Sequence, residues 1–164
     1  MKGYVMEMGI VDRQSVVMPV QLLLDTMLAT NPDAILRLER LASVETVVEG
    51  LKFSGTPSAL LEEFRQTDLA GFFIFVAPGS RGGLISVRPP RCYGSTFPYW
   101  HIVADNRDGW DEPLLDKIVQ FEGVCFAAIS DDDTMDLHEL DHVDENNFPW
   151  DHWRLVAARV PGPK

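Results

Sequence analysis

Apolar residues recur along the chain with two different periods, and these periods predict a mixture of strands and helices. Residues 4–11 alternate between apolar and other side chains after a glycine, which predicts a first strand. Residues 20–30 instead carry Leu and Met at helical spacing, so a helix is expected there. Residues 33–42 follow an Asn-Pro-Asp break and carry apolar side chains at Ile35, Leu38, Leu41 and Ala42. This stripe predicts a second helix, with Arg37, Glu39 and Arg40 facing water.

The remaining pattern predicts more strands than helices. A helix is expected to begin after Thr56, which suits the N-cap, with Pro57 in the first position. The continuous apolar run at residues 72–76 predicts a central strand buried on both faces. Further strands are expected at residues 45–53, 84–87, 99–104, 124–129 and 153–160, a turn at 105–109, and helices at 110–121 and around 135–143.

Helices concentrate early in this order and strands late, which favours one fold class over the others. We expect an α+β fold, with a mostly antiparallel sheet and the N-terminal helices packed on one face. Neither a linker nor an internal repeat interrupts the chain. Residues 1–160 are therefore expected to form a single globular domain, followed by a loose tail at 161–164.

Net charge narrows the function classes. The 164 residues include 14 Lys and Arg against 25 Asp and Glu, which gives a net charge of −11. This balance opposes binding to nucleic acid and to anionic membranes, and it favours encounter with basic proteins. The start of the chain lacks a signal-peptide pattern, no apolar run reaches the length of a membrane span, and only Cys92 and Cys125 occur. A cytoplasmic location is therefore expected.

Residues 131–153 are the chemically most distinctive stretch, because residues 131–151 hold nine acids, two histidines and no Lys or Arg. One interpretation is a surface for a basic protein partner, with Trp150 as an aromatic anchor. Its acids would be Asp131, Asp132, Asp133, Asp136, Glu139, Asp141, Asp144 and Glu145. In that interpretation the chain is not an enzyme and needs no cofactor.

A metal site is the alternative interpretation of the same stretch. Residues 138–142 fit H-E-x-x-H, in which His138 and His142 would share a zinc ion and Glu139 would polarise a bound water. Against a zinc hydrolase, Asp141 puts a charge inside the motif, and no downstream pattern names a third ligand. A calcium site at residues 131–136 lacks the EF-hand order of ligands. A structural or regulatory module without either ligand is a further alternative.

Three features of the chain together resemble a known class of proteins. They are the segment Asn106-Arg107-Asp108-Gly109-Trp110-Asp111, the acidic and aromatic residues 131–153, and the character of a small acidic α+β domain. The chain is similar to the immunity proteins of bacterial polymorphic-toxin and contact-dependent systems. The resemblance implies a protein that binds one secreted toxin, often a basic nuclease, and blocks it. Acidic side chains would then occupy the place of the phosphates that the toxin normally meets.

Overall fold

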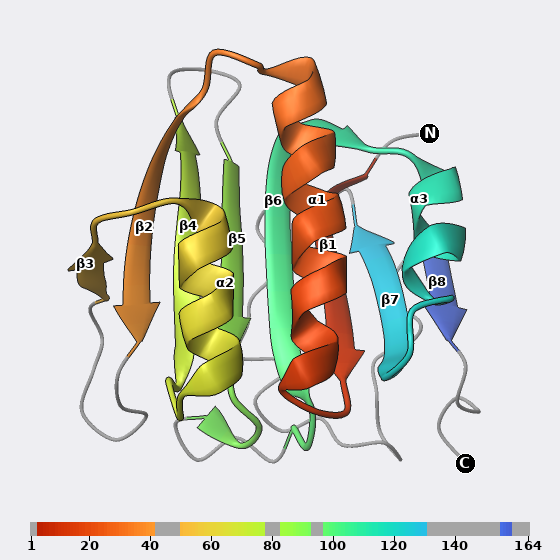
Figure 1. Ribbon diagram of the computed structural model, residues 1–164. Helices are drawn as coiled ribbons and strands as arrows, with labels where there is room; N and C mark the ends of the chain where they lie inside the picture. The colour runs from red at the N-terminus through yellow and green to blue at the C-terminus, as the bar shows by residue number, and fades with distance from the viewer. Residues whose placement is uncertain (1–2, 42–49, 78–82, 93–96, 131–154, 159–164) are drawn as a thin grey trace.

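One antiparallel sheet runs through the part of the chain that the computed structural model describes, which comprises residues 3–41, 50–77, 83–92, 97–130 and 155–158 (Figure 1). Its strands are β1 (Gly3–Ile10), β2 (Ile35–Leu41), β3 (Leu51–Phe53), β4 (Gly71–Ala77), β5 (Gly83–Arg88), β6 (Trp100–Trp110), β7 (Val124–Ser130) and β8 (Leu155–Ala158). The helices are η1 (Gln14–Val16), a 3₁₀ turn, and α1 (Val17–Thr30), α2 (Pro57–Gln66) and α3 (Glu112–Ile118).

The strand order places the first strand inside the sheet, between two strands that come much later in the sequence. The order is β3-β2-β4-β5-β6-β1-β7-β8, and every neighbouring pair is antiparallel. In Figure 1, α2 lies over β4 and β5, α1 over β6 and β1, and α3 over β7 and β8. The predicted α+β fold with a mostly antiparallel sheet and helices on one face is therefore confirmed. None of the helices in the described ranges is long and apolar enough to cross a membrane.

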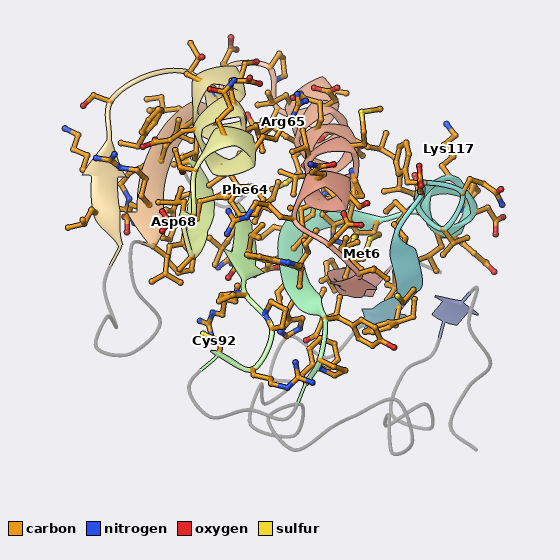
Figure 2. The ribbon with its side chains drawn as sticks, turned by 60° about the horizontal axis from the view of Figure 1, so that its bottom comes forward. Met6, Phe64, Arg65, Asp68, Cys92 and Lys117 are labelled. Atoms are coloured by element: carbon orange, nitrogen blue, oxygen red, sulfur yellow. The ribbon has the colours of Figure 1, made fainter. Side chains whose placement is uncertain are left out.

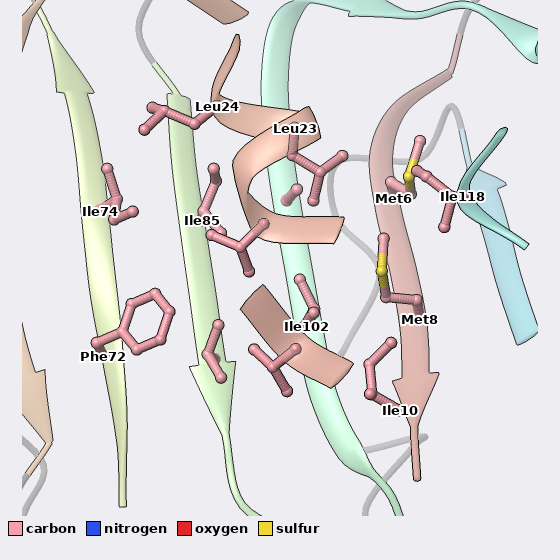
Figure 3. Packing of buried hydrophobic residues seen from close by; sticks show 14 of the residues in the cluster. Met6, Met8, Ile10, Leu23, Leu24, Phe72, Ile74, Ile85, Ile102 and Ile118 are labelled. Carbon is pink, nitrogen blue, oxygen red and sulfur yellow. The ribbon is translucent and has the colours of Figure 1, made fainter. Parts of the chain in front are cut away.

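Period-two patterning selects which face of the sheet the helices cover. In β1, Met6, Met8 and Ile10 point to the helix side and are fully buried. Figure 3 shows these side chains in one layer with Ile102 of β6 and with apolar residues of β4, β5 and α1. Because successive strand residues point to opposite faces, the intervening positions lie on the other face, which none of the described helices covers. We call this second surface the open face.

Arg13 fastens the loop after β1 to the helix layer. Its Nη1 donates hydrogen bonds to the backbone carbonyls of Phe64, at 3.0 Å, and Leu69, at 2.7 Å. The guanidinium group also lies over the rings of Phe64, at 4.6 Å, and Trp100, at 4.8 Å. Burial lowers the pKa of Arg13, and the Asp68 carboxylate opposes this effect. Two carbonyls and two aromatic rings at these distances stabilise this partly buried cation.

The predicted start of α2 is confirmed at the level of its cap. Thr56 has an extended backbone, its Oγ1 accepts a hydrogen bond of 3.1 Å from the Ala59 amide, and Pro57 follows in the first turn. Thr56→Ala is expected to lower the free energy of unfolding by about 1 kcal/mol, because a helix N–H loses its acceptor. Urea unfolding followed by circular dichroism measures this loss. Thr56→Ser keeps the hydroxyl and should cost much less; equal losses in the two variants would contradict the cap.

Residues 33–42 were expected to form a helix, and that prediction is wrong. The structure has strand β2 there, and it pairs with β4 along its whole length. The sequence Ile-Leu-Arg-Leu-Glu-Arg-Leu fits both periods, because it also alternates strictly from Leu36 to Glu39. Pairing with the apolar strand β4 decides between the two, since only a strand can share its backbone hydrogen bonds.

Four further predictions need correction in detail. Phe73 and Phe75 of β4 are half-buried on the open face, so β4 is fully buried on its helix side only. The expected turn at residues 105–109 lies inside β6, as an irregular bulge. Trp110 was expected to begin a helix but closes β6, and α3 begins only at Glu112. The strand expected at 45–53 is the short β3, and residues 42–49 lie outside the described part.

Candidate binding site

The acidic stretch at residues 131–151, which was predicted to bind a basic partner or a metal ion, lies outside the described residues. This applies to the acids and Trp150 of the predicted partner surface and equally to His138 and His142 of the H-E-x-x-H motif. Candidate residues for a binding site therefore come from the described part of the chain. There, no group of three or more His, Cys, Asp or Glu residues is arranged to hold a metal ion.

A bulge in β6 helps to form a hollow that is lined by two carboxylates. Gly3 of β1 lies opposite Trp110, whereas Val5 lies opposite Asp105. Two steps along β1 (5 − 3) thus correspond to five along β6 (110 − 105), so residues 106–109 have no partner in the ladder with β1. Gly109 supplies the positive φ of 83° that this path needs.

Hydrogen bonds inside the bulge fix its shape. Asn106 is buried; its Nδ2 donates to the Gly109 carbonyl at 3.0 Å, and its Oδ1 accepts from the Asp108 amide at 3.1 Å. The indole Nε1 of the fully buried Trp110 donates to the Ala104 carbonyl at 3.0 Å. Both ends of the bulge are thereby anchored, so the Asp108 carboxylate is presented from a rigid loop.

The bulge, the end of α1 and the start of α3 enclose a pocket of about 310 Å³. We call it the acidic pocket. Its lining residues are Thr26, Thr30, Asn106, Asp108, Gly109, Asp111, Pro113, Leu114 and Lys117. Two carboxylates and one ammonium group therefore face a volume that also has hydroxyl groups and an apolar side. A side chain with an aliphatic stem and a cationic head matches this combination.

Thr30 couples α1 to the pocket carboxylate. Its hydroxyl lies 3.1 Å from Oδ2 of Asp108 and also 3.1 Å from the backbone carbonyl of Met27. A hydroxyl has one proton, so it can donate to only one of these acceptors at a time. A cation entering the pocket could take the Asp108 oxygen while the Thr30 hydroxyl turns to the Met27 carbonyl. The helix end would then lose no hydrogen bond.

A buried acid and histidine on the open face were not predicted as a site from the sequence. Glu7 of β1 is 1% exposed, and its Oε2 lies 3.1 Å from Nε2 of His101 on β6. His101 also packs against the ring of Phe97, with ring centroids 5.0 Å apart. A charged residue between two buried methionines in an apolar strand was the signal that could have drawn attention to Glu7. Its partner His101 lies 94 positions away in the sequence.

A second hollow, separate from the acidic pocket, has a volume of about 490 Å³. It lies on the open face over β2, β4 and β5. Its lining comprises Arg37, Glu39, Gly50, Phe73, Phe75, Leu84 and Arg88. Arg37 lies 4.1 Å above the Phe75 ring, and its Nε is 3.1 Å from a Glu39 carboxylate oxygen. This second hollow joins aromatic rings to arginine, whereas the acidic pocket joins carboxylates to hydroxyls. The two hollows therefore suit ligands of opposite charge.

Comparison with known proteins adds no relative. No protein-family model, no curated protein and no solved structure matches the sequence. Cys92 and Cys125 are buried and are not joined in a disulfide, as expected of apolar filling residues.

Proposed function

We propose that this protein is a non-enzymatic binding protein that captures a basic protein partner, in the manner of an immunity protein that neutralises a toxin. The supporting observation is the acidic pocket, in which the Asp108 and Asp111 carboxylates face a volume of about 310 Å³. Four of its lining residues belong to the segment Asn106 to Asp111, which is one of the three features on which the resemblance to immunity proteins rests. A cytoplasmic site of action belongs to the same proposal.

The pocket suits a lysine or arginine side chain of the partner. The stem would lie against Pro113 and Leu114, and the charged head would meet the carboxylates of Asp108 and Asp111. A carboxylate and a cation that lose water together form a strong contact only when both are held in place. The bulge supplies this rigidity on the acidic side. The net charge of −11 acts over a longer range and would speed the encounter.

Lys117 also lines this pocket, so a cation of the partner would enter a site that already holds one positive charge. Its ammonium group contributes a positive charge to a lining that has two carboxylates. A long side chain at the last turn of α3 can swing outward at little cost, because its stem is flexible. We therefore expect the partner's cation to displace Lys117. Lys117→Met, which keeps the stem and removes the charge, should strengthen binding.

The decisive experiment measures binding to the product of the gene adjacent to this one, because immunity proteins are encoded beside their toxins. Biolayer interferometry at several salt concentrations is suited to the measurement. Asp108→Asn combined with Asp111→Asn is expected to weaken binding at least about tenfold, since two carboxylate contacts with a cation are lost. The salt dependence of the association constant should become flatter as well.

A matched control removes the same number of charges elsewhere. Glu62→Gln combined with Glu122→Gln changes two exposed acids outside the pocket lining. It should change affinity less than about twofold, because exposed charges far from a contact are screened. Equal losses in the two double variants would reduce the role of the pocket to general charge. The absence of any complex with the wild-type protein would refute the immunity proposal itself.

A further inference from the structure

The outer edge of β2 is only partly covered in the described part of the chain. β2 pairs with β4 over all seven of its residues, from Ile35 to Leu41. On its other side, β3 pairs only with Leu38, Glu39 and Arg40. Figure 1 shows the short β3 beside the lower part of β2, with the upper part extending beyond it. Among the described strands, none pairs with the outer edge of residues 35–37.

The cap of α2 explains why β3 stops where it does. After Phe53 the chain leaves the sheet and reaches the N-cap Thr56 within three residues (56 − 53). The backbone that would continue the ladder opposite Arg37 is thus used to begin a helix. Ile35 remains 69% exposed, the highest value among the exposed large apolar residues of the described chain, and the Arg37 side chain is 64% exposed.

Side chains along this edge show what a further strand should carry. Where β3 does cover β2, Lys52 lies directly opposite Glu39, so opposite charges face each other across the two strands. Arg37 is the next residue of β2 on the same face, and Ile35 is the one after it. Arg37 already has Phe75 beneath it and Glu39 beside it. On its outer side, the complementary cross-strand residue would be an acid.

We propose that residues Ile35–Arg37 bind an extended segment of a protein partner by strand addition. The added strand would run antiparallel to β2, with an acid opposite Arg37 and an aliphatic residue opposite Ile35. Backbone hydrogen bonds to β2 would supply affinity, and these two side chains would supply specificity. This site is distinct from the acidic pocket, takes the opposite charge and does not depend on the proposed toxin binding.

Short peptides test this proposal directly. The probe is acetyl-STDTITS-amide, in which Asp would face Arg37 and Ile would face Ile35. Amide chemical shifts and hydrogen exchange of the protein are measured by NMR during titration. We expect shift changes and slower exchange centred on residues 35–37. The peptide with Lys in place of Asp should bind about fivefold more weakly. The peptide acetyl-STDPITS-amide should not bind, because Pro cannot donate the central hydrogen bond.

A charge exchange separates strand addition from simple charge attraction. With Arg37→Glu, the preference should reverse, so that the Lys peptide binds more tightly than the Asp peptide. Arg37→Gln should abolish the preference while retaining binding, and it serves if the Glu variant does not fold. The proposal is overturned if residues 35–37 do not respond, or if the Pro peptide binds equally well. It is also overturned if the same residues respond to protein concentration alone, since the edge would then pair with a second copy of the chain.

Discussion

Phe64→Ala is expected to lower the free energy of unfolding by about 3–5 kcal/mol, the range measured for large aromatic truncations in protein cores. The Phe64 side chain is fully buried and points from α2 toward the sheet (Figure 2). Its ring contacts Phe72 at a centroid distance of 5.2 Å and Trp100 at 5.3 Å, both edge-on. Truncation would also remove one of the two rings that stabilise the partly buried Arg13 guanidinium. Urea unfolding followed by tryptophan fluorescence measures this loss.

A matched phenylalanine on the other face provides the control. Phe73 lies one residue from Phe72 on β4, but it is half-buried on the open face. Phe73→Ala should therefore cost clearly less than Phe64→Ala, because less apolar area returns to water. Similar losses for the two variants would mean that the open face is as tightly packed as the helix side. Phe64→Leu should recover part of the stability, since it refills some of the cavity.

His101→Leu is expected to destabilise the protein by about 1–3 kcal/mol, because the buried Glu7 carboxyl group loses its hydrogen-bond partner. The Glu7 carboxylate is 1% exposed and lies 3.1 Å from the imidazole nitrogen of His101. Leucine has a similar size and should refill much of the space of the ring. The loss of stability would therefore reflect mainly the lost interaction between His101 and the Glu7 carboxyl group. Urea unfolding at pH 7 measures this loss.

A double-variant cycle isolates the pair. Glu7→Gln removes the charge and keeps the shape, so His101→Leu made in that background should cost much less than in the wild type. The difference between the two losses is the coupling energy of the pair. Additive losses would contradict the interpretation and would assign the effect of His101→Leu to lost packing against Phe97, whose ring lies 5.0 Å away.

Local signals in the sequence sufficed for much of the fold. Alternation predicted β1, helical spacing predicted most of α1, and Thr56 with Pro57 predicted the start of α2 to the residue. The helix prediction for residues 33–42 was wrong because their pattern fits both the helical and the strand period. Only pairing with the neighbouring strand β4 decides for a strand. The prediction that Trp110 begins a helix was wrong because the position of this residue, too, depends on a contact outside the local sequence. Its indole is held by the Ala104 carbonyl, a contact that arises only after the bulge has formed.

The candidate site could not be predicted from local sequence patterns for a different reason, which is the separation of its residues along the chain. Thr30 and Asp108 line one pocket although they lie 78 positions apart in the sequence. No rule of spacing joins a helix end to a bulge at that separation. The segment from Asn106 to Asp111 was singled out for its resemblance to immunity proteins, and its predicted turn gave no hint of a cavity. The predicted acidic surface at residues 131–151 stays a prediction.

The place of β1 between β6 and β7 has a consequence for folding during synthesis. β1 leaves the ribosome first of all the strands, yet Met8 pairs with Ile102 on one side, 94 residues later (102 − 8), and with Ala127 on the other. Until those strands emerge, an apolar segment with Met6, Met8 and Ile10 has no native neighbour in the sheet. Such long-range pairing slows folding and exposes the nascent chain to aggregation. We therefore expect α1, which follows β1 directly, to shield that strand while the rest of the sheet is being made.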